Sequence, residues 1–100
     1  MNLDVWLSLA VIRNWEPLMR ELGVSVVARS PRGFLTAYKK AKGRPSQLSE
    51  EWVRKREGFL KRHLAQAAGR EPWFDADGWP TRRHLALIAW AFSPVPGRIS

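Results

Sequence analysis

Apolar and polar residues along the chain recur with the period of an α-helix. The clearest case is residues 50–68, where a wheel at about 100° per residue separates an apolar arc from a basic one. Ser49 precedes this segment as an N-cap, and Gly69 follows it as a stop signal. We therefore predict a helix from Glu50 to about Ala68. Its apolar arc contains Trp52, Val53, Phe59, Leu60, Leu64 and Ala67.

Start and stop signals predict further short helices. An aspartate and an asparagine are placed to cap one helix over residues 4–13 and a second over residues 14–22, which Gly23 ends. Residues 25–30 fit either a short helix or a strand, and we take them as helical. A Ser-Pro pair then opens a helix over residues 31–42.

The last predicted helix, residues 82–92, follows Thr81 as its cap and is apolar on every side from Leu85 onward. Such a helix is expected to be buried all round, and the alternative is an apolar face that forms a homodimer. No segment shows convincing strand alternation. We predict an all-α fold, a single domain over residues 1–100 that packs as a compact bundle of about five short helices around the buried C-terminal helix.

Residues 69–80 break the helical pattern and hold two prolines, two glycines and two tryptophans. Such a composition predicts an ordered loop that aromatic packing holds in place. Trp73 and Trp79 belong to this loop, and base stacking is their alternative role. The other four tryptophans fall at helical core positions, so we expect all six to serve packing.

The net charge of +8, from 17 Lys and Arg against 9 Asp and Glu, is unevenly distributed. Residues 29–62 hold eleven basic groups against three acidic ones, so this segment alone carries the whole excess, and the rest of the chain is balanced at six of each sign. A cation excess confined to one segment is typical of proteins that bind a polyanion.

If the helices 31–42 and 50–68 pack as an antiparallel pair, their outer faces merge into one basic surface that contacts phosphates. We expect a small nucleic-acid-binding protein that prefers double-stranded DNA to RNA, and the alternative is a regulatory module that docks the same face on an acidic protein. A helix-turn-helix fits only in a shifted form, with residues 34–42 as the reading helix. The cations assigned to phosphates are Arg32, Lys39, Lys40, Lys42, Arg44, Arg54, Lys55, Lys61 and Arg62.

Arg56 and His63 interrupt the apolar arc of the 50–68 helix. A buried guanidinium needs a partner, because an unpaired charge inside a protein costs several kcal/mol. Two interpretations are open. Arg56 pairs with Glu71, Asp75 or Asp77 and ties the loop to the helix, or it emerges into a functional cleft.

Arg82 and Arg83 begin the last helix, where the positive pole of the helix dipole disfavours cations. In one interpretation, one of the two arginines pairs with Asp75 or Asp77 and clamps the loop. In the other, the two arginines and the exposed N–H groups form an anion site that holds a phosphate.

No motif predicts catalysis, a metal or a cofactor. The chain has no cysteine, its two histidines match no metal-ligand spacing, and "DADG" lacks the downstream glutamate of a calcium loop. The apolar run near the N-terminus lacks a basic leader and a cleavage site, and it is far shorter than the roughly 20 residues that span a bilayer. We therefore expect a cytoplasmic protein that does not enter the membrane and is not an enzyme.

Overall fold

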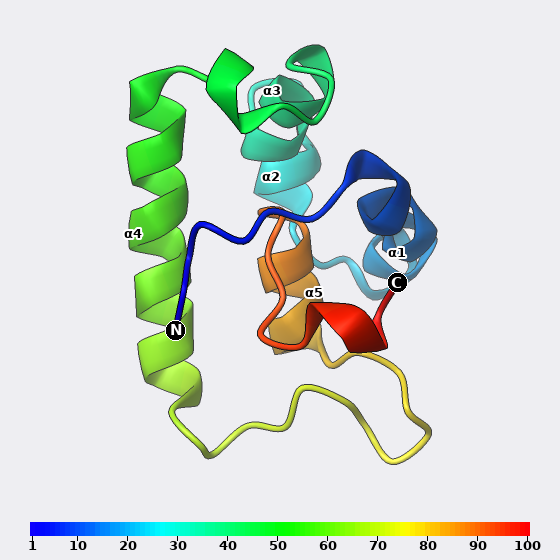
Figure 1. Cartoon of the computed structure of the whole chain (residues 1–100). Helices are drawn as coiled ribbons and strands as arrows, with labels where there is room; N and C mark the ends of the chain where they lie inside the picture. Colours follow the sequence, from blue (N-terminus) through cyan, green and yellow to red (C-terminus); the bar gives the residue numbers. More distant parts are fainter.

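The computed structural model describes all 100 residues and consists of helices and turns (Figure 1). No strand is present, and the one pairing of the strand type is an isolated bridge between Phe74 and Pro80. The predicted all-helical class is therefore confirmed. No helix has the length and apolar character needed to cross a membrane. The elements are α1 (Leu9–Leu22), α2 (Val26–Arg29), α3 (Phe34–Lys40), the 3₁₀ turn η1 (Pro45–Gln47), α4 (Glu50–Ala67), α5 (Arg82–Ile88) and the 3₁₀ turn η2 (Pro96–Arg98).

One helix, α1, replaces the two that were predicted over residues 4–13 and 14–22. Its N-cap is Ser8, whose hydroxyl accepts a hydrogen bond from the Val11 amide at 3.2 Å, and the helix continues through Pro17 to its end at Gly23. The two-helix prediction is wrong because the buried residues Ile12, Glu16 and Met19 form one continuous face, and packing this face outweighs the hydrogen bond that the proline removes. Gly23 ends the helix in the left-handed region, as predicted.

The segment from α2 to α3 makes a very tight turn. Gly33, not the Ser-Pro pair, caps α3, so the helix predicted over residues 31–42 is shorter than expected. A Cβ atom on Gly33 would clash with the carbonyl oxygen of Val27, so no side chain fits there. Lys42 and Gly43 then take left-handed conformations and end α3.

The predicted caps of the second half of the chain are confirmed. Ser49 accepts a hydrogen bond from the Trp52 amide at the start of α4, and Thr81 accepts one from the His84 amide at the start of α5. The last helix ends at Ile88 rather than at residue 92, and Ala91 forms a left-handed turn directly after it.

The core lies where α5 and the turn after it meet the other helices (Figure 1). A column of stacked rings crosses it: the ring centroids of Phe34 and Trp90 are 4.7 Å apart, those of Trp90 and Phe59 4.6 Å, and those of Phe59 and His63 4.2 Å. The column joins α3, the turn after α5, and α4. Both faces of the Trp90 indole are thus covered by neighbouring rings.

Candidate nucleic-acid interface

Three of the predicted phosphate ligands gather around one cleft, which we name the basic corner. The end of α3, η1 and the start of α4 enclose a cleft of about 560 Å³ that Lys40, Lys42 and Arg44 line together with Trp52. None of the three cations takes part in an ion pair. In Figure 1 this corner is the upper end of the molecule, where η1 leads into α4. The cations of the basic corner are therefore free to meet an external anion.

The local sequence explains why these cations are unpaired. Lys40 belongs to the last turn of α3, where the helix dipole favours a cation, and Lys42 and Arg44 follow in the turn that ends the helix. The nearest acid along the chain after Arg44 is Glu50, which points its carboxylate to Arg54 within α4. No acid of the segment is thus available to neutralise the corner.

Of the other five predicted cations on α3 and α4, all but Arg62 have an acidic partner. Three exposed pairs lie along α4: Arg54 with Glu50 at 3.7 Å, Lys55 with Glu51 at 3.0 Å, and Lys61 with Glu57 at 2.8 Å. Hydrogen bonds from the two lysines lower the pKa values of Glu51 and Glu57. Exposed pairs contribute only about 0 to 1 kcal/mol, so these cations can still turn toward a phosphate, but a carboxylate stays beside each of them.

Lys39 is held more firmly, at 2.9 Å from a carboxylate oxygen of the buried Glu16 in α1. Withdrawing this lysine would leave a buried carboxylate with Arg20 alone, at 3.5 Å. Arg32 and Arg62 form no ion pair, but neither lines the basic corner. Arg62 lies instead over a smaller cleft beside Phe59.

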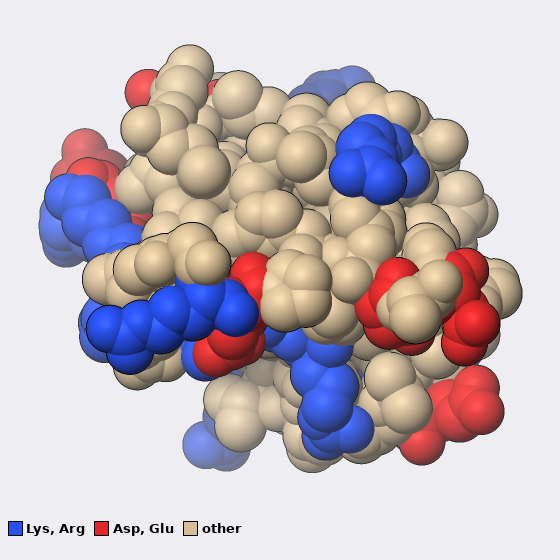
Figure 2. Space-filling model, turned by 90° about the horizontal axis from the view of Figure 1, so that it is seen from below, with Lys and Arg blue, Asp and Glu red and all other residues tan.

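The antiparallel pairing of the two basic helices is not formed. The main packing partner of α3 is α2, and that of α4 is α5. The predicted surface therefore divides into the unpaired basic corner and the largely neutralised outer face of α4. The molecule seen from below, away from the corner, shows basic and acidic groups interspersed (Figure 2).

Arg56 is buried, as expected, but its partners are not the predicted acids. Its guanidinium donates to four backbone carbonyls, those of Leu3, Val5, Trp90 and Ala91, at 2.6 to 3.0 Å. The group also lies 3.6 Å from the centre of the Trp6 ring. Burial lowers the pKa of Arg56 to about 10, which leaves it protonated at neutral pH. Arg56 therefore ties the N-terminal segment to α4 and to the turn after α5.

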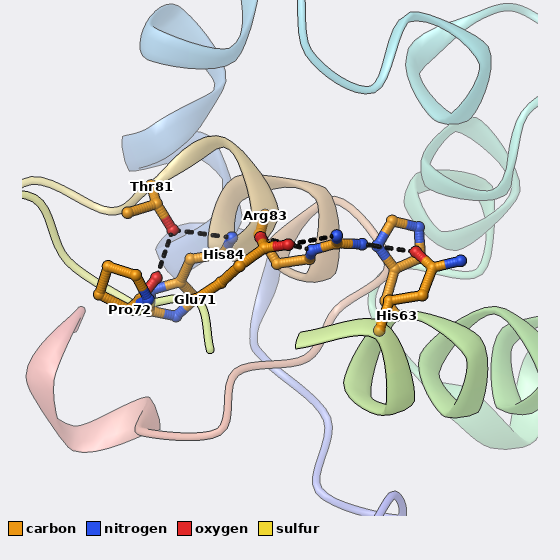
Figure 3. Close-up of polar contacts among 7 residues, drawn as sticks. His63, Glu71, Pro72, Thr81, Arg83 and His84 are labelled. Carbon is orange, nitrogen blue, oxygen red and sulfur yellow. Dashed lines mark hydrogen bonds and ion pairs between the residues drawn. The ribbon is translucent and has the colours of Figure 1, made fainter. Parts of the chain in front are cut away.

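Arg83 clamps the loop, but through a different acid from those predicted (Figure 3). Its guanidinium makes a fork with Glu71, at 2.9 and 2.7 Å, and its third nitrogen contacts His63 Nδ1 at 2.9 Å and Gln66 at 2.8 Å. The fork raises the pKa of Arg83 and lowers that of Glu71. Arg82 is exposed and forms no ion pair. An anion at this helix start would have to compete with Glu71 for Arg83, so the arrangement favours the clamp.

Both histidines are held in the neutral form. Burial, followed by the charge of Arg83, lowers the pKa of His63. His84 is fully buried, with Nδ1 2.8 Å from the Trp73 carbonyl and Nε2 2.7 Å from the Ser93 hydroxyl, and burial lowers its pKa. The carbonyl accepts only from a protonated Nδ1, so Nε2 is the acceptor of the hydroxyl proton. Neither histidine belongs to a group of residues that would hold a metal ion.

Comparison of this chain with models of protein families, with curated proteins and with solved structures gave no match.

Proposed function

We propose that this protein binds nucleic acid by contacting the phosphates of duplex DNA, with the basic corner as its main contact. The observation that supports this proposal is that Lys40, Lys42 and Arg44 surround one cleft without any acid among them. Lysine and arginine side chains that replace the counterions of DNA supply most of the affinity of non-specific binding. Arg32 and Arg62, which also lack ion pairs, are the additional contacts.

The surroundings of the corner favour phosphate contact over the reading or stacking of bases. A reading helix has to present several side chains to base edges, whereas α3 is seven residues long and buries Phe34, Leu35 and Tyr38. The element before it, α2, is only four residues long. Lys55 lies 5.1 Å from the centre of the Trp52 ring, the aromatic ring of the corner. We therefore expect weak dependence on base sequence and a preference for duplex over single strands.

The salt dependence of binding measures how many cations take part. Each phosphate contact contributes about −0.9 to the slope of log K against log salt concentration, so the corner alone gives about −2.7 and the corner with Arg32 and Arg62 about −4.5. All nine cations of the sequence prediction would give about −8. Fluorescence anisotropy with a random duplex between roughly 50 and 200 mM salt separates these values. A slope of −2.7 weakens binding only about 40-fold over that range, whereas the steeper slopes weaken it far more.

The decisive variant is K40Q/K42Q/R44Q, which we expect to lose most of the affinity and about 2.7 of the slope. The corner side chains are exposed or line an open cleft, so the fold should survive, which a thermal melt checks.

The matched control, R13Q/R70Q/R82Q, removes the same charge at three exposed arginines that do not line the corner and form no ion pair. We expect its slope to stay unchanged. If both triple variants lose affinity equally, overall charge rather than the corner drives binding and the assignment is wrong. If the wild-type protein binds duplex at about 50 mM salt no better than it binds poly-glutamate, the corner serves an acidic protein instead.

A further inference from the structure

A second cleft lies between α1 and the loop that precedes α5, and we name it the tryptophan cleft. It encloses about 530 Å³ and shares no lining residue with the basic corner. Trp15 and Trp79 stand edge to face in it, with ring centroids 6.2 Å apart. Leu18, Leu22 and Pro80 extend the apolar lining. In contrast to the corner, this cleft is lined by no cation.

The cleft is held open by a rigid loop. The carboxylate of Asp75 accepts hydrogen bonds from the Asp77 and Trp79 amides, both at 2.9 Å, and the Asp75 amide donates to the Trp79 carbonyl at 2.8 Å. On the other wall, Trp15 Nε1 donates to the Ile99 carbonyl at 3.0 Å. The backbone of Trp79 is thus fixed, yet the residue is 55% exposed, the highest exposure of any aromatic residue in the chain. An exposed indole on a fixed turn is a prearranged binding surface.

The charge at the cleft is opposite to that of the protein as a whole. Four of the nine acids form no ion pair, although the chain offers 17 cations. Two of these four, Glu21 and Asp75, line the tryptophan cleft, and a third, Asp77, belongs to the same turn. Figure 2 shows several acidic groups toward the right-hand edge of the face seen from below, the side on which α1 and the tip of the loop lie in Figure 1.

We propose that the tryptophan cleft binds the side chain of a lysine or arginine presented by a basic segment of a protein partner. Such a side chain combines an apolar stem with a cationic head. The stem matches Leu18 and Leu22, and the head matches the indole of Trp79 and the carboxylates of Glu21 and Asp75, which line the same cleft. The same carboxylates repel a phosphate backbone. A second copy of this chain is disfavoured because each copy carries a net charge of +8.

The test follows the indole N–H signal of Trp79 in an NMR titration with the peptide acetyl-PLRPLR-amide at about 50 mM salt. The control peptide carries citrulline in place of each arginine, which keeps the shape and removes the charge. We expect the arginine peptide to shift the Trp79 signal in a saturable way and to bind at least about tenfold more tightly than the citrulline peptide.

Charge-removing variants locate the site. E21Q and D75N, whose amide still caps the turn, should each weaken binding by about tenfold, whereas E50Q, which removes the same charge from the exposed start of α4, should have no effect. W79A, followed through the indole N–H signal of Trp15 in the same cleft, should abolish binding even where its thermal melt is unchanged.

Three outcomes would overturn the proposal. In the first, both peptides bind equally. In the second, E21Q and D75N bind as the wild type does. In the third, the Trp79 signal moves with protein concentration in the absence of peptide, which would place a second copy in the cleft. The proposal does not depend on DNA binding. A separate titration with duplex tests that function, because we expect duplex to shift the NMR signals of the basic corner and to leave the Trp79 signal unmoved.

Discussion

Replacing Arg56 with methionine tests the structural role of its four buried hydrogen bonds. Of the four carbonyls that Arg56 binds, the one of Ala91 also accepts from the Leu7 amide, so it keeps a partner. The carbonyls of Leu3, Val5 and Trp90 lose theirs. A buried polar group without a partner costs about 1 to 3 kcal/mol, and the carbonyls of the N-terminal segment are partly hydrated after the change. We therefore expect R56M to lose about 3 to 5 kcal/mol of the free energy of unfolding.

The assay is urea unfolding followed by circular dichroism, with the free energy taken from curves of equal slope. R54M is the matched control, since Arg54 lies on the same helix but is exposed, and its pair with Glu50 at 3.7 Å contributes less than about 1 kcal/mol. Hydrogen exchange adds a local readout: the Leu7 amide should lose protection in R56M and keep it in R54M, because Arg56 holds the segment that carries it.

A conservative change guards against a variant that does not fold. R56K keeps the charge but replaces the planar fork with a point charge, so it should lie between R56M and the wild type in stability. The reasoning is refuted if R56M unfolds within about 1 kcal/mol of R54M, because three orphaned carbonyls would then have no measurable cost.

Three further changes test other contacts. R83A should lose about 1 to 2 kcal/mol in a thermal melt with unchanged DNA affinity, whereas R82A should change neither; equal losses would contradict the clamp. G33A should lose about 3 kcal/mol, because its Cβ would clash with the backbone carbonyl oxygen of Val27, and a G33A melt equal to that of the wild type would contradict this. Burial lowers the pKa of His84 in the folded protein, so the unfolded chain takes up the proton first as the pH falls below about 6.5. The contribution of His84 to stability is therefore complete above that pH. Below it, the free energy of unfolding declines by up to about 1.4 kcal/mol per pH unit. Between pH 7 and 5, the stability of H84Q in thermal melts should decline less than that of the wild type. If the two proteins decline equally, His84 is not the cause of the pH dependence.

The features that the sequence predicts correctly are those that local interactions determine. The caps Ser49 and Thr81 and the stop at Gly23 depend on bonds within one helical turn, so a few neighbouring residues determine them. The break predicted at Asn14 failed because several residues of the N-terminal region are able to cap a helix. Packing of the face that contains Glu16 selects among them, and packing is not visible in a short window.

The partners of Arg56 and Arg83 also depend on the tertiary fold, and the sequence did not predict them correctly. The acceptors of Arg56 are backbone carbonyls, which every sequence has, so no residue type reveals them. Arg83 clamps the loop through Glu71, whereas Asp75, one of the predicted partners, accepts hydrogen bonds from two amides of its own turn. A carboxylate two residues before a turn amide is a readable signal of such capping.

The sequence also held the information that divides the nine predicted cations. Arg54, Lys55 and Lys61 each follow a glutamate by four residues, the spacing that brings side chains together on a helix, and all three pairs form. Lys40 and Lys42 have no acid at that spacing, and both are unpaired. The pair of Lys39 with Glu16 joins two helices and required the fold.

The two proposed surfaces carry opposite charge on one molecule, so the distance over which their fields act determines whether they influence each other. The molecule measures 37 × 26 × 23 Å, whereas the screening length is about 8 Å at physiological salt and about 30 Å at 0.01 M. At low salt the field of the net charge of +8 reaches the tryptophan cleft and opposes a basic peptide, and a polyanion on the basic corner removes that opposition. The two clefts share no lining residue and lie on different elements, so the shorter screening length at physiological salt weakens the field of the corner at the cleft. Long-range charge therefore couples the two surfaces more strongly at low salt than at physiological salt.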